Sequence, residues 1–387
     1  MSKIRLSRRS FLAVPPAAVL LASGRVRAEG TPTYFPPAGK WERKAPEAVG
    51  MDGTQLKATL DFAKTQDSGF DFARDQVKRF GPPMGLVPKS RAQVNGIIIR
   101  HGYIVGEFGD INAVDPVYSM AKSINSMSLG VAVTQGKIAN LDAPVKDMVK
   151  DGGYDSPHNS KITWRHHVTQ TSEWEGKLFE RNADFVGAEK FGGGALPPRA
   201  IKDPGTYYEY NDVRMNRFAL SMAWVFGKGL PEVLKENVMD PIGASNTWKW
   251  LGYDNSFVDI NGKKVQGVTG GSRWGGGFFT NDEDIGRLGL LLLNKGRWNG
   301  KQLISEAYLR DAVQATPLGP DYGYLFWLNT KGKKWPNAPR DAYAAVGNGS
   351  NVIWVSPQHD LVMILRWIKD DAAIDAVAKQ VIGSIKA

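Results

Sequence analysis

The chain has 387 residues, no cysteine and a formal net charge of +10. The lack of cysteine excludes a disulfide framework and thiol catalysis, and no long basic run or interleaving of basic and aromatic residues indicates nucleic-acid binding. With five histidines and no HExxH motif, we expect neither a metal nor another cofactor, and we interpret the adjacent His166 and His167 as structural or surface residues.

The first 28 residues are predicted to be an export signal that does not belong to the fold. Basic residues precede a moderately apolar stretch at residues 11–21, and Val26-Arg27-Ala28 offers a small-residue cleavage site. Residues 7–12, with the sequence SRRSFL, resemble the twin-arginine signature. We therefore expect a bacterial protein exported by the twin-arginine machinery to the periplasm or the medium, without a retained membrane anchor. The alternative is an unstructured basic N-terminus. Removal of the segment lowers the formal net charge from +10 to +4.

Periodicity, prolines and turn residues divide the first part of the mature chain into a few elements. A short amphipathic helix is expected from Asp52, followed by a proline-interrupted loop at residues 70–93 that rims a site. A hairpin comes next, with strands at 95–100 and 103–108. The following helix is expected to carry Ser119 at its first turn and to continue through the apolar run 123–133.

The middle of the chain, from residue 136 to about 270, is predicted to consist of helices and long loops, and strands return after it. The expected helices are at residues 141–149, 161–171, 213–227, 230–238 and 282–294, with a last helix from Asp371; the expected late strands are at 322–329, 343–346, 351–356 and 361–368.

Strands at both ends around a helical middle predict an α/β (α+β) fold with one antiparallel sheet flanked by helices. The sheet subdomain is expected to comprise residues of about 45–110 and 275–387, and an inserted helical subdomain residues of about 111–274. We expect a cleft where the two subdomains meet.

The pattern SxxK at Ser119 and Lys122 is the first candidate for chemistry. On a helix, residues three apart emerge on one face, so the two side chains are within reach of each other. A serine hydroxyl is a poor nucleophile until a neighbouring base takes its proton, and a desolvated lysine can do so. The free NH groups at a helix start could also stabilise negative charge on a bound carbonyl oxygen. A chance occurrence of this short pattern is the alternative.

A second titratable group is needed to carry the proton to a leaving group. Tyr210 is a candidate, because Pro204 and Gly205 make a turn before it and the helix at residues 213–227 follows it. A lysine ammonium nearby would stabilise its phenolate. The alternative is a half-buried packing tyrosine.

The segment 345–351 is the third candidate, because two glycines lie within three residues between strand runs. Glycine in a strand marks the close approach of a ligand or another backbone. The NH of Ser350 could then join that of Ser119 in an oxyanion hole, with an ordinary hairpin turn as the alternative.

These three motifs, in this order, resemble the serine β-lactamase-related hydrolases, which include class C β-lactamases, family VIII esterases, D-amino-acid peptidases and nylon-oligomer hydrolases. Residues 162–172 are similar to the segment before the family's Thr-Ser-Gly loop, and residues 275–285 resemble the glycine-rich turn that enters its late helix. The resemblance implies a β-lactamase/transpeptidase-like fold. It also implies that Ser119 is the nucleophile, that Lys122 and Tyr210 form the base and proton-relay pair, and that Ser119 and Ser350 supply the oxyanion NH groups.

Two departures from the family pattern concern the substrate. Gly347-Asn348-Gly349 stands where β-lactamases carry Lys-Thr-Gly and lacks the cation that would pair with a β-lactam carboxylate. The loss of such a contact costs about 2–5 kcal/mol, so weak or no β-lactamase activity is expected. Glu173 stands where the family often has glycine, and together with the adjacent Trp174 it is a candidate for shaping an acyl pocket. A surface loop is the alternative.

A third departure concerns the base. Asp212 replaces the usual amide, and a carboxylate close to Lys122 would favour the ammonium form of that lysine. Tyr210 would then be the working base.

We therefore expect a serine hydrolase, either a carboxylesterase or an amidase, that forms an acyl-enzyme on Ser119. Its expected partner is a small ester, amide or peptide substrate. A D-amino-acid or cell-wall peptidase of the same fold and a catalytically inactive binding protein remain alternatives. The candidate site residues are Ser119, Lys122, Tyr210, Asp212, Asn348, Gly349, Ser350 and Trp174.

Overall fold

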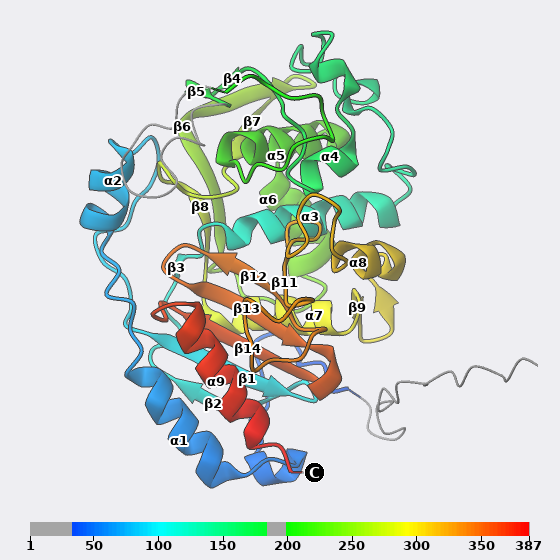
Figure 1. Ribbon diagram of the computed structural model, residues 1–387. Coiled ribbons are helices and arrows are strands. Elements are labelled where there is room, and N and C mark those ends of the chain that lie inside the picture. Colours follow the sequence, from blue (N-terminus) through cyan, green and yellow to red (C-terminus); the bar gives the residue numbers. More distant parts are fainter. Residues whose placement is uncertain (1–32, 184–198, 387) are drawn as a thin grey trace, which may run out of the picture. The chain divides into compact units, whose positions relative to one another are not determined.

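The structure, a computed structural model, describes residues 33–183 and 199–386 (Figure 1). The predicted export signal at residues 1–28 lies outside the described residues. Among the helices that are described, none combines the length and the apolar character needed to cross a bilayer.

The central sheet has the strand order β11-β12-β13-β14-β1-β2, and each neighbouring pair is antiparallel. β1 and β14 are apolar and buried along nearly their whole length because helices cover both faces of the sheet. The predicted hairpin at residues 95–108 and the strands predicted after residue 343 are confirmed, whereas the strand predicted at 322–329 is reduced to the two residues of β11. The bounds are β1 (Asn95–Arg100), β2 (Tyr103–Phe108), β11 (Trp327–Leu328), β12 (Tyr343–Gly347), β13 (Asn351–Ser356) and β14 (Leu361–Arg366).

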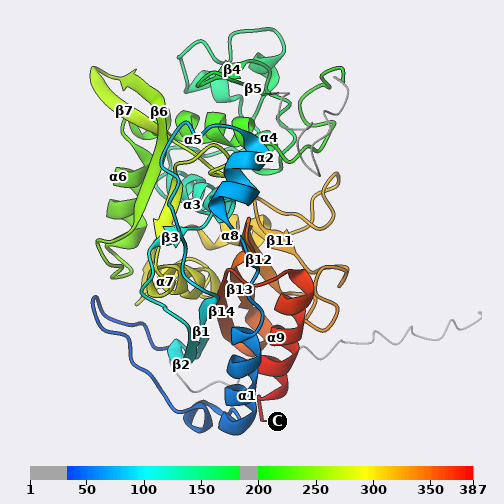
Figure 2. The same cartoon turned by 90° about the vertical axis from the view of Figure 1, so that its left-hand side faces the viewer.

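Helices cover this sheet on both sides. α1 (Gly53–Lys64) and the C-terminal α9 (Asp371–Gly383) lie side by side on one face, and α7 (Asp282–Leu293) packs on the other (Figures 1 and 2). Gly286 and Gly289 of α7 face the sheet, where an added Cβ would lie 2.8 Å from Ile97 and 2.6 Å from Val362. These glycines let α7 approach the strands closely. The helices predicted from Asp52, at 282–294 and from Asp371 are confirmed.

A second antiparallel sheet, with the order β3-β8-β6-β7, contradicts the prediction that the middle of the chain holds only helices and loops. The hairpin of β6 and β7 turns at Asn261-Gly262, where both residues have positive φ, 55° and 78°. Asn-Gly between two extended runs is a strong hairpin signal, so the sequence did carry the information. The bounds are β3 (Asp115–Pro116), β6 (Lys249–Ile260), β7 (Lys263–Val268) and β8 (Gly277–Thr280).

The helices next to the second sheet position the candidate site. α3 (Met120–Thr134) is buried over almost its whole circumference, and α5 (Asp212–Phe226) packs against it. The prediction of a helix at residues 213–227 is confirmed. The helix predicted at 141–149 is only a 3₁₀ turn, that at 161–171 is the five-residue α4, and the loop predicted at 70–93 contains a π-helical turn and α2.

The remaining elements are short. They are α2 (Lys78–Phe80), α4 (Trp164–Val168), α6 (Leu230–Leu234), α8 (Glu306–Ala312), the strand pairs β4 (Lys177–Leu178) with β5 (Arg181–Asn182) and β9 (Arg297–Trp298) with β10 (Lys301–Gln302), 3₁₀ turns at Pro46–Val49, Val145–Asp147, Asn159–Lys161 and Pro357–His359, and π-helical turns at Phe72–Val77 and Lys235–Met239.

Candidate active site

Ser119 lies at the junction between β3 and α3. Tyr118 has φ 51°, an uncommon left-handed conformation for a tyrosine, and turns the chain so that α3 begins at Met120 directly after Ser119. The Tyr118 hydroxyl donates a 2.6 Å hydrogen bond to Gln76 Oε1, and its ring packs edge-on against Trp367. The turn that presents Ser119 is therefore held from two sides.

The structure brings Ser119, Lys122, Tyr210 and Asp212 together. Lys122 has a fully buried side chain, and its Nζ donates to Ser119 Oγ at 2.8 Å. The same ammonium forms an ion pair with Asp212 and lies 4.7 Å from the centre of the Tyr210 ring. The hydroxyl of Ser119, the carboxylate of Asp212 and the ring of Tyr210 thus surround the buried amine of Lys122.

Asp212 is the first residue of α5, where the side chain of the N-cap residue Asn211 accepts from Arg214 N at 2.9 Å. One carboxylate oxygen of Asp212 faces Lys122, and the other lies 3.0 Å from Arg273 Nε. The extra negative charge that Asp212 introduces is therefore shared by two cations. Sequence reasoning missed Arg273, which lies 61 residues further along the chain in an irregular loop with no periodic pattern.

A cleft of about 820 Å³ is lined by Ser119, Tyr210, Asp212 and Arg273, whereas Lys122 lies beneath its surface. Four aromatic rings, those of Tyr208, Tyr210, Tyr322 and Trp327, pack on one another with centroid separations of 4.9–6.0 Å and form one wall. Burial raises the pKa of Tyr208 and of Tyr322 above the ordinary value, so both are neutral phenols at physiological pH. The residues that line the cleft are Arg79, Phe80, Tyr118, Ser119, Tyr208, Tyr210, Asp212, Gly271, Arg273, Leu318, Gly319, Pro320, Asp321, Tyr322, Trp327, Val346, Gly347, Asn348 and Asp371.

The end of β12 also lines the cleft and packs against the turn before α3. Val346, Gly347 and Asn348 line the cleft, but Gly349 and Ser350 do not. β12 ends at Gly347, so residues 348–350 form the turn to β13, in which Gly349 packs on Trp367 and Ser350 has φ 55°. Of the candidate residues in this segment, the lining of the cleft therefore includes Asn348.

In a comparison with protein-family models, the sequence of residues 112–379 matches the β-lactamase family. The chain belongs to that family. A search of curated proteins found no significant match. Among solved structures, a protein described as a 6-aminohexanoate-dimer hydrolase from Bacillus anthracis has a TM-score of 0.58 and 14% identity, with 91% of this chain and 89% of that chain covered.

Two further solved structures share the β-lactamase/transpeptidase-like fold of the chain. A penicillin-binding protein homologue from Caulobacter crescentus has a TM-score of 0.58 at 14% identity and covers 87% of this chain and 99% of that one. A family VIII carboxylesterase has a TM-score of 0.55 at 15% identity, with coverages of 85% and 97%. At these identities the neighbours show the fold alone.

Trp174 does not line the cleft of this β-lactamase-family protein. Its side chain is buried, and its Nε1 donates to Gly153 O at 2.7 Å. The neighbouring Glu173 belongs neither to an acyl pocket nor to a surface loop, because its fully buried carboxylate is paired with Arg199 and Arg214. Both predictions for this segment took account of its sequence neighbours but not of ion-pair partners more than 25 residues away.

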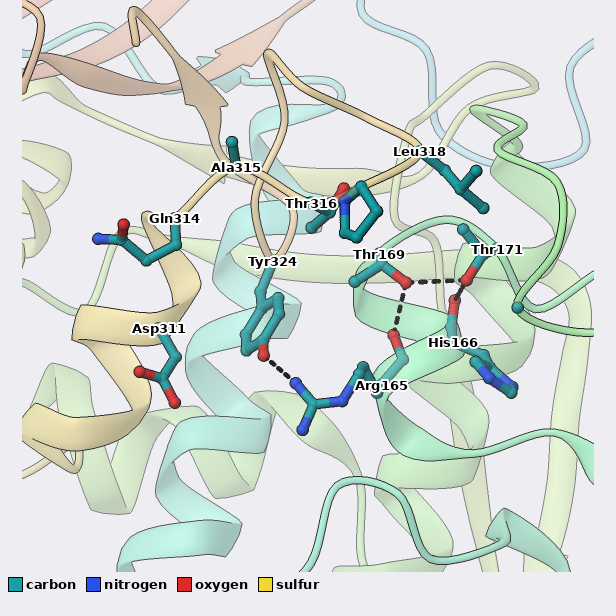
Figure 3. Close-up of a pocket in the computed structure, with 12 residues that line it drawn as sticks. Arg165, His166, Thr169, Thr171, Asp311, Gln314, Ala315, Thr316, Leu318 and Tyr324 are labelled. Atoms are coloured by element: carbon teal, nitrogen blue, oxygen red, sulfur yellow. Dashed lines mark hydrogen bonds between the residues drawn. The ribbon is translucent and has the colours of Figure 1, made fainter.

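A second cavity of about 470 Å³ lies between α4 and α8 and contains none of the residues discussed above as nucleophile or base (Figure 3). Leu318 lines both this cavity and the cleft. His166 lines the second cavity, and burial lowers its pKa, so its ring is neutral at pH 7. His167 is fully buried, bonds Tyr154 through Nε2 at 2.8 Å and stacks on Phe218. Both histidines therefore have local structural contacts.

Among residues 33–183 and 199–386, no group of three or more His, Asp or Glu side chains is arranged to hold a metal ion. The predicted loop at residues 70–93 does rim the cleft, through Arg79 and Phe80. No sequence pattern predicted the aromatic wall beyond Tyr210, because Tyr322 and Trp327 reach it only through the fold.

Proposed function

We propose that this protein is a serine hydrolase that cleaves ester or amide bonds through an acyl-enzyme on Ser119. The observation that supports this most directly is the 2.8 Å hydrogen bond from the buried Lys122 ammonium to Ser119 Oγ, with the Tyr210 ring beside the same ammonium. Ser119 and Tyr210 both line an open cleft. A nucleophile within hydrogen-bond reach of a titratable group that other residues orient is the arrangement that covalent catalysis requires.

In the proposed reaction, Ser119 Oγ attacks the substrate carbonyl while the Tyr210–Lys122 pair takes its proton. The tetrahedral intermediate then collapses, the bond to the alcohol or amine breaks, and Tyr210 gives the proton to that leaving group. Water attacks the acyl-enzyme by the same route in reverse. Because Lys122 is paired with Asp212, we assign the base to the Tyr210 phenolate and a charge-stabilising role to the Lys122 ammonium.

Negative charge on the carbonyl oxygen needs donors. We assign this role to the backbone NH groups of Ser119, at the start of α3, and of Asn348, directly after the end of β12. The position of Asn348 in the cleft lining supports this assignment over Ser350.

The chemistry of the cleft supports small esters or amides with apolar groups as substrates, because an aromatic wall adjoins the reacting centre. The structural neighbours described as a carboxylesterase and as a 6-aminohexanoate-dimer hydrolase are consistent with ester and amide cleavage on this fold. We propose weak or absent β-lactam turnover, since the end of β12 presents Val346, Gly347 and Asn348 to the cleft and thus no cation.

The test is hydrolysis of p-nitrophenyl esters of short acids by the purified protein, with Ser119→Ala as the matched control. The proposal expects release of p-nitrophenol that Ser119→Ala abolishes. Linear amides, muropeptides and nitrocefin in the same panel separate the esterase and amidase from a cell-wall peptidase and a β-lactamase. Equal rates for wild type and Ser119→Ala on every substrate would refute the proposal and favour a binding protein.

We also propose that the protein acts in the periplasm or outside the cell after twin-arginine export. The pair Arg8 and Arg9 in residues 7–12 supports this location. Replacing both with lysine should leave the full-length protein in the cytoplasm in cell fractionation, while the wild type is recovered in the periplasm. Export of the double variant at the wild-type level would contradict the proposal.

A further inference from the structure

Four charged side chains that do not line the cleft form a compact ion-pair network. It consists of Glu173, Arg199, Glu209 and Arg214. Each arginine contacts both carboxylates, at distances of 2.6–2.8 Å. The network is therefore cyclic, with two positive and two negative charges in alternation. A balanced and fully bonded arrangement is what makes burial of such charges tolerable.

Glu173 occupies the buried corner of this network. Its side chain is 0% exposed, compared with 31% for Arg199 and 13% for Glu209. Its carboxylate accepts four hydrogen bonds, two from Arg199, one from Arg214 and one from the Lys202 NH at 2.9 Å. Burial by itself would raise the pKa of the Glu173 carboxyl, but these donors hold it below its ordinary value. The group is therefore ionised at neutral pH, and both arginines are fixed around it.

The other carboxylate of the network lies in the segment that carries the proposed base. Glu209 stands between Tyr208 and Tyr210, whose side chains both line the cleft. Arg199 contacts this segment twice, through its 2.8 Å bond to Glu209 and through its guanidinium, which lies 4.2 Å from the centre of the Tyr207 ring. Arg199 therefore holds the segment through two side chains that do not line the cleft.

Arg214 fixes the helix that follows the base. It is the third residue of α5, and besides its carboxylate contacts its Nε donates to Trp174 O at 3.1 Å. Glu173 is thus linked, through one arginine each, to the chain before Tyr210 and to the chain after it. A displacement of about 1 Å at a reacting group can cost about a hundredfold in rate, so this support bears on catalysis.

We infer that Glu173 is a positioning residue for Tyr210, acting through Arg199 and Arg214 without contact to the substrate. This inference rests on the proposed function, because it concerns the base of that reaction. It gives a role to a buried acid that lies outside the cleft.

The experiment compares Glu173→Gln with wild type in the hydrolysis of a short p-nitrophenyl ester. The amide keeps the shape of the side chain but leaves the network with one uncompensated positive charge. We expect kcat to fall at least tenfold with KM within threefold, since substrate contacts are unchanged. Asp203→Asn is the matched control, because Asp203 lies a few residues before Tyr207 and its exposed carboxylate pairs with the exposed Lys161. This variant should keep wild-type kinetics.

A second variant separates positioning from stability. Glu173→Gln with Arg199→Gln restores the balance of charge, so its melting temperature should recover toward wild type. If Glu173 positions Tyr210, kcat of this double variant stays low, because Arg199 no longer bonds Glu209. Should Glu173→Gln fail to fold, kcat of the double variant decides the question.

Two results would overturn the inference: a folded Glu173→Gln protein with wild-type kcat, or recovery of kcat together with the melting temperature in the double variant. A wild type that hydrolyses no substrate would instead count against the proposed function, so the two failures are distinguishable.

Discussion

Gly347 is the position at which a single methyl group should disturb the site most. It packs against the turn that presents Ser119, and a Cβ added there would lie 1.9 Å from the Val117 carbonyl oxygen and 3.2 Å from Met120 N. Ordinary van der Waals contact begins near 3.4 Å, so β12 and the turn would have to separate by about 1.5 Å. Both partners are backbone atoms, which cannot rotate away.

Gly347→Ala should therefore affect both stability and rate. Overpacking of this kind costs about 1–3 kcal/mol, and the gain of about 0.4–1 kcal/mol from replacing glycine in the unfolded chain offsets only part of it. A shift of about 1 Å between the nucleophile and the oxyanion donors should lower kcat/KM about a hundredfold. Urea unfolding measures the first effect and p-nitrophenyl ester hydrolysis the second.

The matched control is Gly383→Ala at the end of α9, where an added Cβ meets nothing within 4 Å. Alanine is the better helix former by about 1 kcal/mol, so this variant should be slightly more stable than wild type and equally active. The reasoning fails if Gly347→Ala folds with wild-type stability and retains wild-type kcat/KM.

The other predictions concern charged groups. Burial raises the pKa of Asp282 to about 7, although Arg366 at 3.5 Å favours the charged form. The folded state therefore keeps a proton that the unfolded state releases near pH 4. The free energy of unfolding should then fall by about 4 kcal/mol as pH rises from 4 to 7. Asp282→Asn should remove this pH dependence. Urea unfolding of wild type and variant at pH 4, 5.5 and 8 measures it, and the same change of stability with pH in both proteins would contradict the prediction. Asp212→Asn leaves the buried Lys122 and Arg273 without their shared carboxylate and should lower the free energy of unfolding by about 3–5 kcal/mol. Adding Arg273→Met should recover part of this loss in the same assay. No recovery would argue against a carboxylate shared by the two cations. Lys122→Met keeps the volume of the side chain but should lower kcat by about 10²–10⁴-fold, and stopped-flow ester hydrolysis at the wild-type rate would exclude the lysine from catalysis.

The sequence was most informative where local chemistry decides the structure. Asp52, Asn211 and Asn281 each accept a backbone NH at a helix start, and each of these helices begins within one residue of its predicted position. The β1–β2 hairpin was predicted with its correct bounds, because two apolar runs flank a turn that needs positive φ.

The prediction failed where the decisive partner is distant in sequence. Tyr322 and Trp327 were expected in one continuous strand, but the chain turns back between them so that their rings meet in the aromatic wall. Arg273 faces Asp212 because the second sheet, itself not predicted, brings its loop to α5. Glu173 was interpreted from its neighbours in the chain, whereas its environment is set by arginines at positions 199 and 214.

The central claim is that one serine becomes covalently acylated, and peptide mapping by mass spectrometry after treatment with a fluorophosphonate tests it most directly. The account predicts a single adduct on the peptide that contains Ser119, absent in Ser119→Ala and much slower to form in Lys122→Met. An unmodified wild-type protein, or an adduct located on any other serine, would contradict it.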